Sequence, residues 1–236
     1  NIIRSDIQRA EKTGFLSSGF HGDFCTSFVT GSYLRGIRDF DVDKAYQLAL
    51  NNATRSWCNG RKGGRKYGDE YRRRGWIAEN RVANPTVKTE ENEAKASVQK
   101  TTEYAYSDYS VALMARALGD TESCNVLMDR SKNYRNLFDK STGFMRGRLD
   151  DGSWVTPFDP GIPYYVYMYR ESNGWMATFF APHDPQGLVS LFPNKGAFEA
   201  KLDKLFSTPF EGYEADNMTG WFGQYCVGNQ PSQGIA

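Results

Sequence analysis

The chain has 236 residues, a formal net charge of +1 and a mean hydropathy of −0.63. This length allows one large domain or two small ones, and the near-zero charge excludes the broad positive field with which proteins bind nucleic acid or acidic membranes. No apolar run approaches the roughly 20 residues that a membrane helix needs, so we expect no membrane insertion.

Aromatic residues make up 14% of the chain, which favours a carbohydrate-facing surface, because tyrosine and tryptophan offer flat apolar area with a polar group. The four cysteines form no CxxC pair, so a zinc site is not expected. Two N-x-[ST] sequons begin at Asn52 and Asn217. With the even cysteine count they favour a secreted or extracytoplasmic protein, and they leave disulfide pairing open. The first residues carry no signal-peptide pattern.

The first two predicted elements are helices with aspartate N-caps. Asp23 precedes a helix that starts at Phe24 and ends near Gly31 or Gly36. Asp41 precedes a second helix, whose apolar face is formed by Val42, Ala45, Tyr46 and Ala49.

A basic, glycine-containing run follows over residues 59–84. A nucleic-acid contact is one interpretation of this run, but it is local and partly balanced by Asp69 and Glu70. A solvated loop with a short helix is the interpretation we favour. Residues 85–100 are polar, and we expect them to be exposed.

Two further helices, over 102–118 and 121–138, are predicted to form an αα-hairpin, because Gly119 ends the first and the link is short. Their inner faces carry Val111, Met114, Ala115 and Leu118, and Cys124, Leu127, Ser131, Tyr134 and Phe138.

Residues 139–170 contain turn signals and are expected to be irregular. Asp184 followed by Pro185 predicts a helix that reaches about Phe192, and another helix is predicted over 195–206. Neither βαβ alternation nor a glycine-rich phosphate loop is present. Helical hairpins with long loops predict a mainly α protein of the α/α toroid type, in which loops at one end of the ring build the site.

The candidate site lies in residues 170–188, where Glu171 is followed by Asn173 and Trp175, and then by His183 and Asp184. A carboxylate, an amide and an indole suit a sugar site, since they supply a proton donor, a hydroxyl contact and a flat apolar face. The alternative is that Glu171 caps or pairs near a helix end and that Trp175 belongs to the core.

Ten sequence blocks, taken in order, resemble the catalytic domain of glycoside hydrolase family 92, the calcium-dependent exo-acting α-mannosidases. They are G-F-H-G-D (19–23), Y-L-R-G-I-R-D-F-D (33–41), N-A-T (52–54), T-T-E-Y-A-Y (101–106), N-Y-R-N-L-F-D (133–139), T-G-F-M-R-G-R (142–148), D-G-S-W-V-T-P-F-D-P (151–160), E-S-N-G-W (171–175), P-H-D-P-Q-G-L (182–188) and G-Q-Y-C-V-G-N-Q-P-S-Q (223–233). The resemblance covers nearly the whole chain.

The resemblance implies a partial (α/α)6 toroid, with residues 1–236 as a single, incomplete catalytic domain. The family's N-terminal β-sandwich and the remainder of the toroid would lie outside this chain, on another segment or chain. The implied activity is inverting hydrolysis of terminal α-linked mannose from glycans. In that chemistry an acid and a base stand roughly 6.5–9.5 Å apart to admit a water molecule.

The resemblance also implies roles for individual residues. Glu171 matches the family's general acid, and Gln224 matches a position associated with Ca²⁺, which accepts amide oxygens as ligands. The residues implied or predicted to contact the mannose are His21, Asp23, Asn173, Trp175, His183, Asp184 and Asn229. Asp184 fits an N-cap equally well.

The chain departs from the family at its closing block. Val227, Gln233 and Gly234 stand where the family has histidines, and Gln230 stands where it has a glutamate. A glutamine cannot transfer a proton as glutamate does. The family's base carboxylates would lie beyond the last block. Two interpretations follow: part of an active α-mannosidase whose base is supplied from outside this chain, or a mannosidase-like protein that binds carbohydrate or has a structural role without turnover.

Overall fold

The computed structural model describes residues 2–18, 22–56, 64–79, 95–162, 168–212 and 218–229. The chain divides into two compact units. Unit 1 comprises residues 1–77 and 103–133, and unit 2 comprises residues 78–102 and 134–236. Each unit is described by itself below, and the expectation of one incomplete toroid domain over 1–236 stays a prediction.

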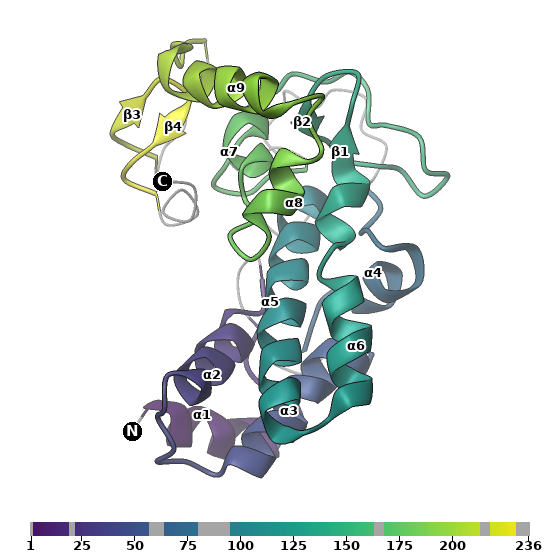
Figure 1. Ribbon diagram of the computed structural model, residues 1–236, viewed down its shortest axis with the longest axis vertical. Helices are drawn as coiled ribbons and strands as arrows, with labels where there is room; N and C mark the ends of the chain where they lie inside the picture. Colours follow the sequence, from purple (N-terminus) through teal and green to yellow (C-terminus); the bar gives the residue numbers. More distant parts are fainter. Residues whose placement is uncertain are drawn as a thin grey trace. The chain divides into compact units, whose positions relative to one another are not determined.

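Unit 1 is built from helices (Figure 1). They are α1 (Ile2–Glu11), α2 (Phe24–Leu34), α3 (Val42–Thr54), α4 (Gly68–Arg74), most of α5 (Ser97–Leu118) and α6 (Thr121–Arg130). Helix α1 was not predicted, although Ile3, Ile7 and Ala10 repeat at helical spacing and are all buried.

The two predicted aspartate caps have different outcomes. Helix α2 begins at Phe24 as predicted, but the Asp23 side chain makes no capping bond. Helix α3 also begins as predicted, and its Asp41 carboxylate accepts the backbone N–H of Lys44 at 2.9 Å. The difference arises because the Asp23 carboxylate is bonded to side chains of the buried interior instead.

Helix α5 starts at Ser97, five residues earlier than predicted, and it ends before Gly119, whose φ of +83° suits glycine. Val111, Met114 and Ala115 are buried as predicted, whereas Leu118 is 36% exposed at the helix end. The α5–α6 hairpin is confirmed, since Arg130 of α6 forms an ion pair with Asp108 of α5.

The prediction that residues 85–100 are exposed was wrong for residues 96–100, which are buried. Their backbone is paired within unit 2: Val98 N donates to the carbonyl oxygen of Met168 at 3.1 Å, and Ser97 N donates to Oε2 of Glu79 at 3.3 Å. Residues 85–94 lie outside the described residues.

Helix α6 ends at Arg130 rather than at Phe138. A 3-10 turn over Asn133–Leu137 follows, and then β1 (Phe138–Asp139) pairs antiparallel with β2 (Phe144–Met145). The predicted inner positions Leu127, Ser131, Tyr134 and Phe138 are nevertheless buried, and Cys124 is half-buried.

The rest of unit 2 consists of short elements: α7 (Gly174–Thr178), α8 (Pro185–Val189), α9 (Lys195–Ser207), β3 (Trp221–Phe222) and β4 (Tyr225–Cys226). Helix α9 matches its prediction, α8 ends three residues short of Phe192, and α7 was not predicted. These elements of unit 2 enclose a core formed by Met176, Phe179, Leu205, Met218, Tyr225 and Cys226. The described strands form only two-stranded ladders, so the prediction of a mainly α chain is confirmed.

The sequons and the cysteines, which favoured a secreted protein, are only partly described by the structure. Asn52 of the first sequon is fully buried, and its Nδ2 donates to the carbonyl oxygen of Leu16 and to Oδ1 of Asp23, so this sequon is not a surface site. The other sequon asparagine and Cys58 lie outside the described residues. Cys25, Cys124 and Cys226 are free thiols. Within the described residues no helix is long and apolar enough to span a membrane.

Candidate active site

Glu171, the predicted general acid, lies in the loop that leads into α7 of unit 2. Its side chain is half-buried and its φ is +45°, in the left-handed region. A residue with a Cβ pays about 1–2 kcal/mol to adopt this conformation. The carbonyl oxygen of Glu171 accepts a hydrogen bond from Nδ2 of Asn229, which holds the loop in this conformation.

Asn173 is fully buried and serves as the N-cap of α7. Its Oδ1 accepts the backbone N–H of Met176 at 3.0 Å, and its Nδ2 donates to Oε1 of Gln224 at 2.9 Å. The amide therefore starts the helix with one end and contacts the predicted metal ligand with the other. Its predicted contact with a sugar hydroxyl stays a prediction.

Gln224 occupies the β3–β4 turn, which is docked on the C-terminal end of α9. Its backbone N–H donates to the carbonyl oxygen of Leu205 at 2.7 Å, and its Nε2 donates to that of Pro209 at 2.8 Å. The preceding Gly223 has a φ of +59°, and a Cβ there would lie 2.4 Å from the carbonyl carbon of Phe206. Only glycine permits this close approach.

The fit of Gln224 to calcium is partial. An amide oxygen is a suitable Ca²⁺ ligand, and because a carbonyl has two lone pairs, Oε1 keeps one after accepting the bond from Asn173. Calcium needs six to eight oxygens, and the described residues include no group of three His, Cys, Asp or Glu side chains that could hold a metal. Calcium binding by Gln224 therefore stays a prediction.

Trp175 is half-buried at the edge of the unit 2 core. Its ring meets that of Phe144 edge to face, with centroids 4.8 Å apart at 88°. Nζ of Lys201 lies 4.8 Å from its centroid. Trp175 therefore packs against the core, as the alternative interpretation expected. Its predicted contact with a sugar stays a prediction.

His183 and Asp184 lie beside Tyr134. The imidazole meets the Tyr134 ring edge to face at 5.5 Å. The Asp184 carboxylate caps α8 by accepting Gly187 N at 3.0 Å, and it also accepts the Tyr134 hydroxyl at 2.8 Å and Nη2 of Arg135 at 2.6 Å. Burial alone would raise the pKa of Asp184, but the hydrogen bonds from Arg135 and Tyr134 outweigh it, and the pKa is lowered. The N-cap interpretation of Asp184 is confirmed.

Asp23 lies in unit 1 and is fully buried. Its carboxylate accepts hydrogen bonds from Thr26 at 2.7 Å, Asn52 at 2.8 Å and Arg65 at 2.8 Å. Burial raises its pKa against the opposing effect of Arg65. These bonds tie the start of α2 to α3 and to the loop before α4. Its contact with a sugar stays a prediction, and His21 lies outside the described residues.

The sequence reading missed the charged network that surrounds Asp23. Arg65 is 1% exposed and binds both Asp23 and Asp108, the latter at 2.5 Å. Arg130 and the Tyr71 hydroxyl also bind Asp108. The prediction that Arg65 belongs to a solvated loop was therefore wrong. Its carboxylate partners lie 42 and 43 residues away in sequence, so the local composition carries no signal of its burial.

Of the positions that depart from the family pattern, Val227 is 58% exposed, next to the β3–β4 hairpin. Gln230, Gln233 and Gly234 lie outside the described residues. The exposure shows that the valine in place of a histidine is not a core substitution.

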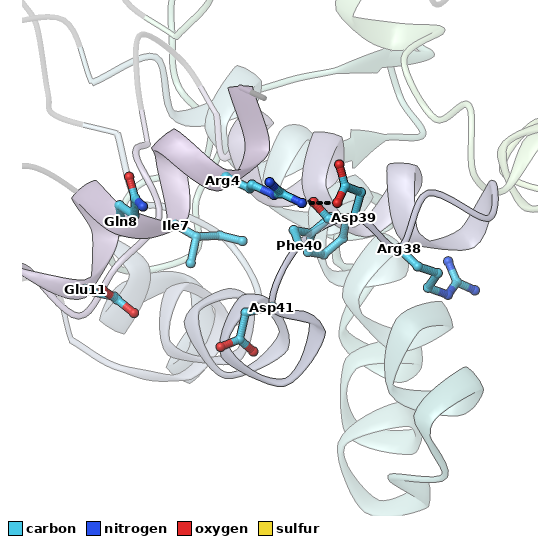
Figure 2. A pocket seen from close by; sticks show the side chains of 8 residues that line it. All are labelled: Arg4, Ile7, Gln8, Glu11, Arg38, Asp39, Phe40 and Asp41. Atoms are coloured by element: carbon cyan, nitrogen blue, oxygen red, sulfur yellow. Dashed lines mark hydrogen bonds and ion pairs between the residues drawn. The ribbon is translucent and has the colours of Figure 1, made fainter.

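A cavity of about 530 Å³ lies in unit 1, between α1 and residues 38–41 (Figure 2). Two of its lining residues, Arg4 and Asp39, form an ion pair, which the dashed line marks, and Ile7 and Phe40 supply apolar surface. None of the predicted site residues that the structure describes lines this cavity.

Residues 4–236 match the model of the "Glycosyl hydrolase family 92 catalytic domain". The chain belongs to glycosyl hydrolase family 92. The family resemblance seen in the ten sequence blocks is thereby confirmed.

Solved structures and a curated relative agree with this family 92 assignment. A family 92 α-mannosidase from Bacteroides thetaiotaomicron, in complex with mannoimidazole, is 26% identical with a TM-score of 0.83, and the match covers 98% of this chain and 30% of that one. An inverting mannosidase of the same organism is 25% identical, with a TM-score of 0.78 and coverages of 98% and 32%. An uncharacterized secreted glycosidase of Arthroderma benhamiae is 27% identical over 81% of this chain and 27% of its own length.

The family 92 chain therefore spans less than a third of the length of these relatives. The likeness to the two solved mannosidases extends over nearly all of it. Together with the α5–α6 hairpin and the other helices described above, it confirms the predicted fold class, a mainly α chain of the α/α toroid type.

Proposed function

We propose that this chain is part of an inverting exo-α-mannosidase that removes terminal α-linked mannose from glycans, with Glu171 as the general acid. The observation that carries the proposal is the likeness over 98% of the chain to two mannosidases, one solved with mannoimidazole and one described as inverting. Because the chain spans about 30% of such an enzyme, we assign the base carboxylates to residues outside 1–236.

The geometry around Glu171 supports the role of a proton donor. A half-buried carboxyl group is accessible to a substrate and partly shielded from water, which suits general acid catalysis. Its backbone is held in a left-handed conformation by Asn229 and is followed at once by the buried cap Asn173. A rigid support of this kind keeps a donor within reach of the leaving oxygen.

The decisive experiment measures the hydrolysis of α-linked mannobiose by the polypeptide that contains residues 1–236. The first product should be β-mannose, seen by NMR before mutarotation. Glu171→Gln should lower kcat/KM by about 10²- to 10⁴-fold, the usual contribution of a general acid. The loss should be smaller for aryl mannosides, whose leaving groups need less protonation.

Glu199→Gln is the matched control, because Glu199 is an exposed carboxylate of α9 paired with Lys195 and lies in the same unit. It should leave the rate unchanged. An unchanged rate for Glu171→Gln would remove this residue from the acid role. Binding of mannobiose without any product would instead establish the carbohydrate-binding alternative.

The proposal includes a secreted or extracytoplasmic location and a glycan substrate. The fungal relative described as a secreted glycosidase supports the location. We also propose that Ca²⁺ takes part in sugar binding with Gln224 as one oxygen ligand, and that the remaining part of the toroid, on another segment or chain, packs against this one. Fractionation of the producing cells tests the location.

A further inference from the structure

A lysine of α9 lies in an aromatic corner of unit 2. Nζ of Lys201 is 3.1 Å from the ring centroid of Phe144 and 4.8 Å from that of Trp175. The two rings are nearly perpendicular to each other. The amine lies within cation–π distance of both. One of these rings belongs to the residue that we expect to face the sugar.

The polar contacts of this amine are weak. Its hydrogen-bond acceptor is the carbonyl oxygen of Thr142 at 3.5 Å, at the outer limit of such bonds. Among the described residues no carboxylate lies within ion-pair distance of Lys201. The carbonyl belongs to the β1–β2 turn, the Phe144 ring to β2 and the Trp175 ring to α7, and α9 itself adds the like charge of Lys204.

The main favourable contacts of the Lys201 ammonium group are therefore the cation–π contacts with the rings of Phe144 and Trp175. An ammonium over an aromatic face gains about 0.5–1 kcal/mol when exposed and about 2 kcal/mol when desolvated. Burial of the amine, together with the like charge of Lys204, lowers the pKa of Lys201 to about 8. Near pH 8 the Lys201 side chain therefore changes from a charged ammonium group to a neutral amine.

We propose that Lys201 is a positioning residue for Trp175: its ammonium group holds the indole in the orientation that presents the ring to a bound glycan. The contact between the glycan and Trp175 rests on the proposed function. The contact between Lys201 and the Trp175 ring does not depend on it. Loss of the proton leaves a neutral amine with a weaker attraction to the ring, so the indole is held less firmly above pH 8.

The first experiment follows the tryptophan emission of the chain from about pH 6.5 to 9.5. The wild type should show an inflection near pH 8. Lys201→Met, which keeps the apolar stem, should lack it, and Lys201→Arg should keep the neutral-pH emission without the inflection, since arginine stays charged. Lys204→Met should move the inflection to higher pH because a like charge is removed. An inflection that persists in Lys201→Met overturns the proposal.

The second experiment measures mannobiose binding by the polypeptide that contains residues 1–236. Lys201→Met should weaken it roughly 3- to 10-fold, in line with the worth of one cation–π contact, and Lys201→Arg should restore wild-type affinity. Equal binding by wild type and Lys201→Met excludes the positioning role. If the wild type binds no mannobiose but its emission titrates with Lys201, the proposed function fails and the hold on Trp175 stands.

Discussion

Nδ2 of Asn173 donates to Oε1 of Gln224 across 2.9 Å, and this bond joins the start of α7 to the β3–β4 turn. A second bond, from Asn229 to the carbonyl oxygen of Glu171, runs between the same two segments. Residues 171–173 and 224–229 are thus tied together twice. The predicted acid and the predicted calcium ligand therefore belong to one hydrogen-bonded assembly.

Asn173→Ala should destabilise the protein by about 2–4 kcal/mol, measured by urea unfolding. The loss of the N-cap accounts for about 1 kcal/mol, and the rest arises because Oε1 of Gln224 loses a buried donor. Asn194→Ala is the matched control, since Asn194 caps α9 with the same bond at 2.9 Å but is exposed. If both variants lose the same stability, the bond to Gln224 contributes nothing.

Arg65→Met should cost about 3–5 kcal/mol of the free energy of unfolding, because it leaves the buried carboxylate of Asp23 without its counter-ion. Combining it with Asp23→Asn should recover part of this loss, since the uncompensated charge is then removed. Arg72→Met serves as the control: its partner Asp69 is exposed, and the expected loss is below about 1 kcal/mol. Strict additivity of Arg65→Met and Asp23→Asn would show that the two side chains do not interact.

The ion pair of Asp184 predicts a pH dependence. Because the native pKa of Asp184 lies below its unfolded value of 3.8, its stabilisation is fully present above that unfolded value and is lost as the pH falls through the native one. Asp184→Asn should therefore cost about 1–2 kcal/mol near neutral pH, and the difference from wild type should shrink below about pH 4. A difference that stays constant down to pH 2 in acid-unfolding curves would contradict this assignment.

Removal of calcium should weaken mannobiose binding if Gln224 holds the ion. We expect EGTA to lower the affinity and excess Ca²⁺ to restore it, and Gln224→Met should make the protein insensitive to both. Binding that is indifferent to chelator in the wild type would identify a metal-free member of the family.

The helix ends that were predicted correctly are those specified by neighbouring residues. Asp41 and Asp184 cap their helices, and Gly119 ends α5. In each case the deciding bond or dihedral lies within four residues, so a local pattern is sufficient. Helix α7 escaped prediction because five residues are too few to show a helical period, although its cap Asn173 is a typical one.

Long-range contacts account for what the sequence could not predict. The basic run around Arg65 resembles a solvated loop, and only the carboxylates of Asp23 and Asp108 make its burial possible. The 170–188 stretch was located by its residue types and the family resemblance. The left-handed backbone of Glu171 and the place of Lys201 beside Trp175 depend on segments that are distant in sequence.

The burial of Asn52 limits how this protein can be produced. An oligosaccharide attached to the emerging chain at this sequon would have to occupy the volume filled by Leu16, Asp23 and Thr26, and a bulky, hydrated group cannot be accommodated there. A eukaryotic secretory host should therefore yield native molecules only from chains in which the sequon was skipped. A bacterial host, which leaves the asparagine bare, avoids this loss.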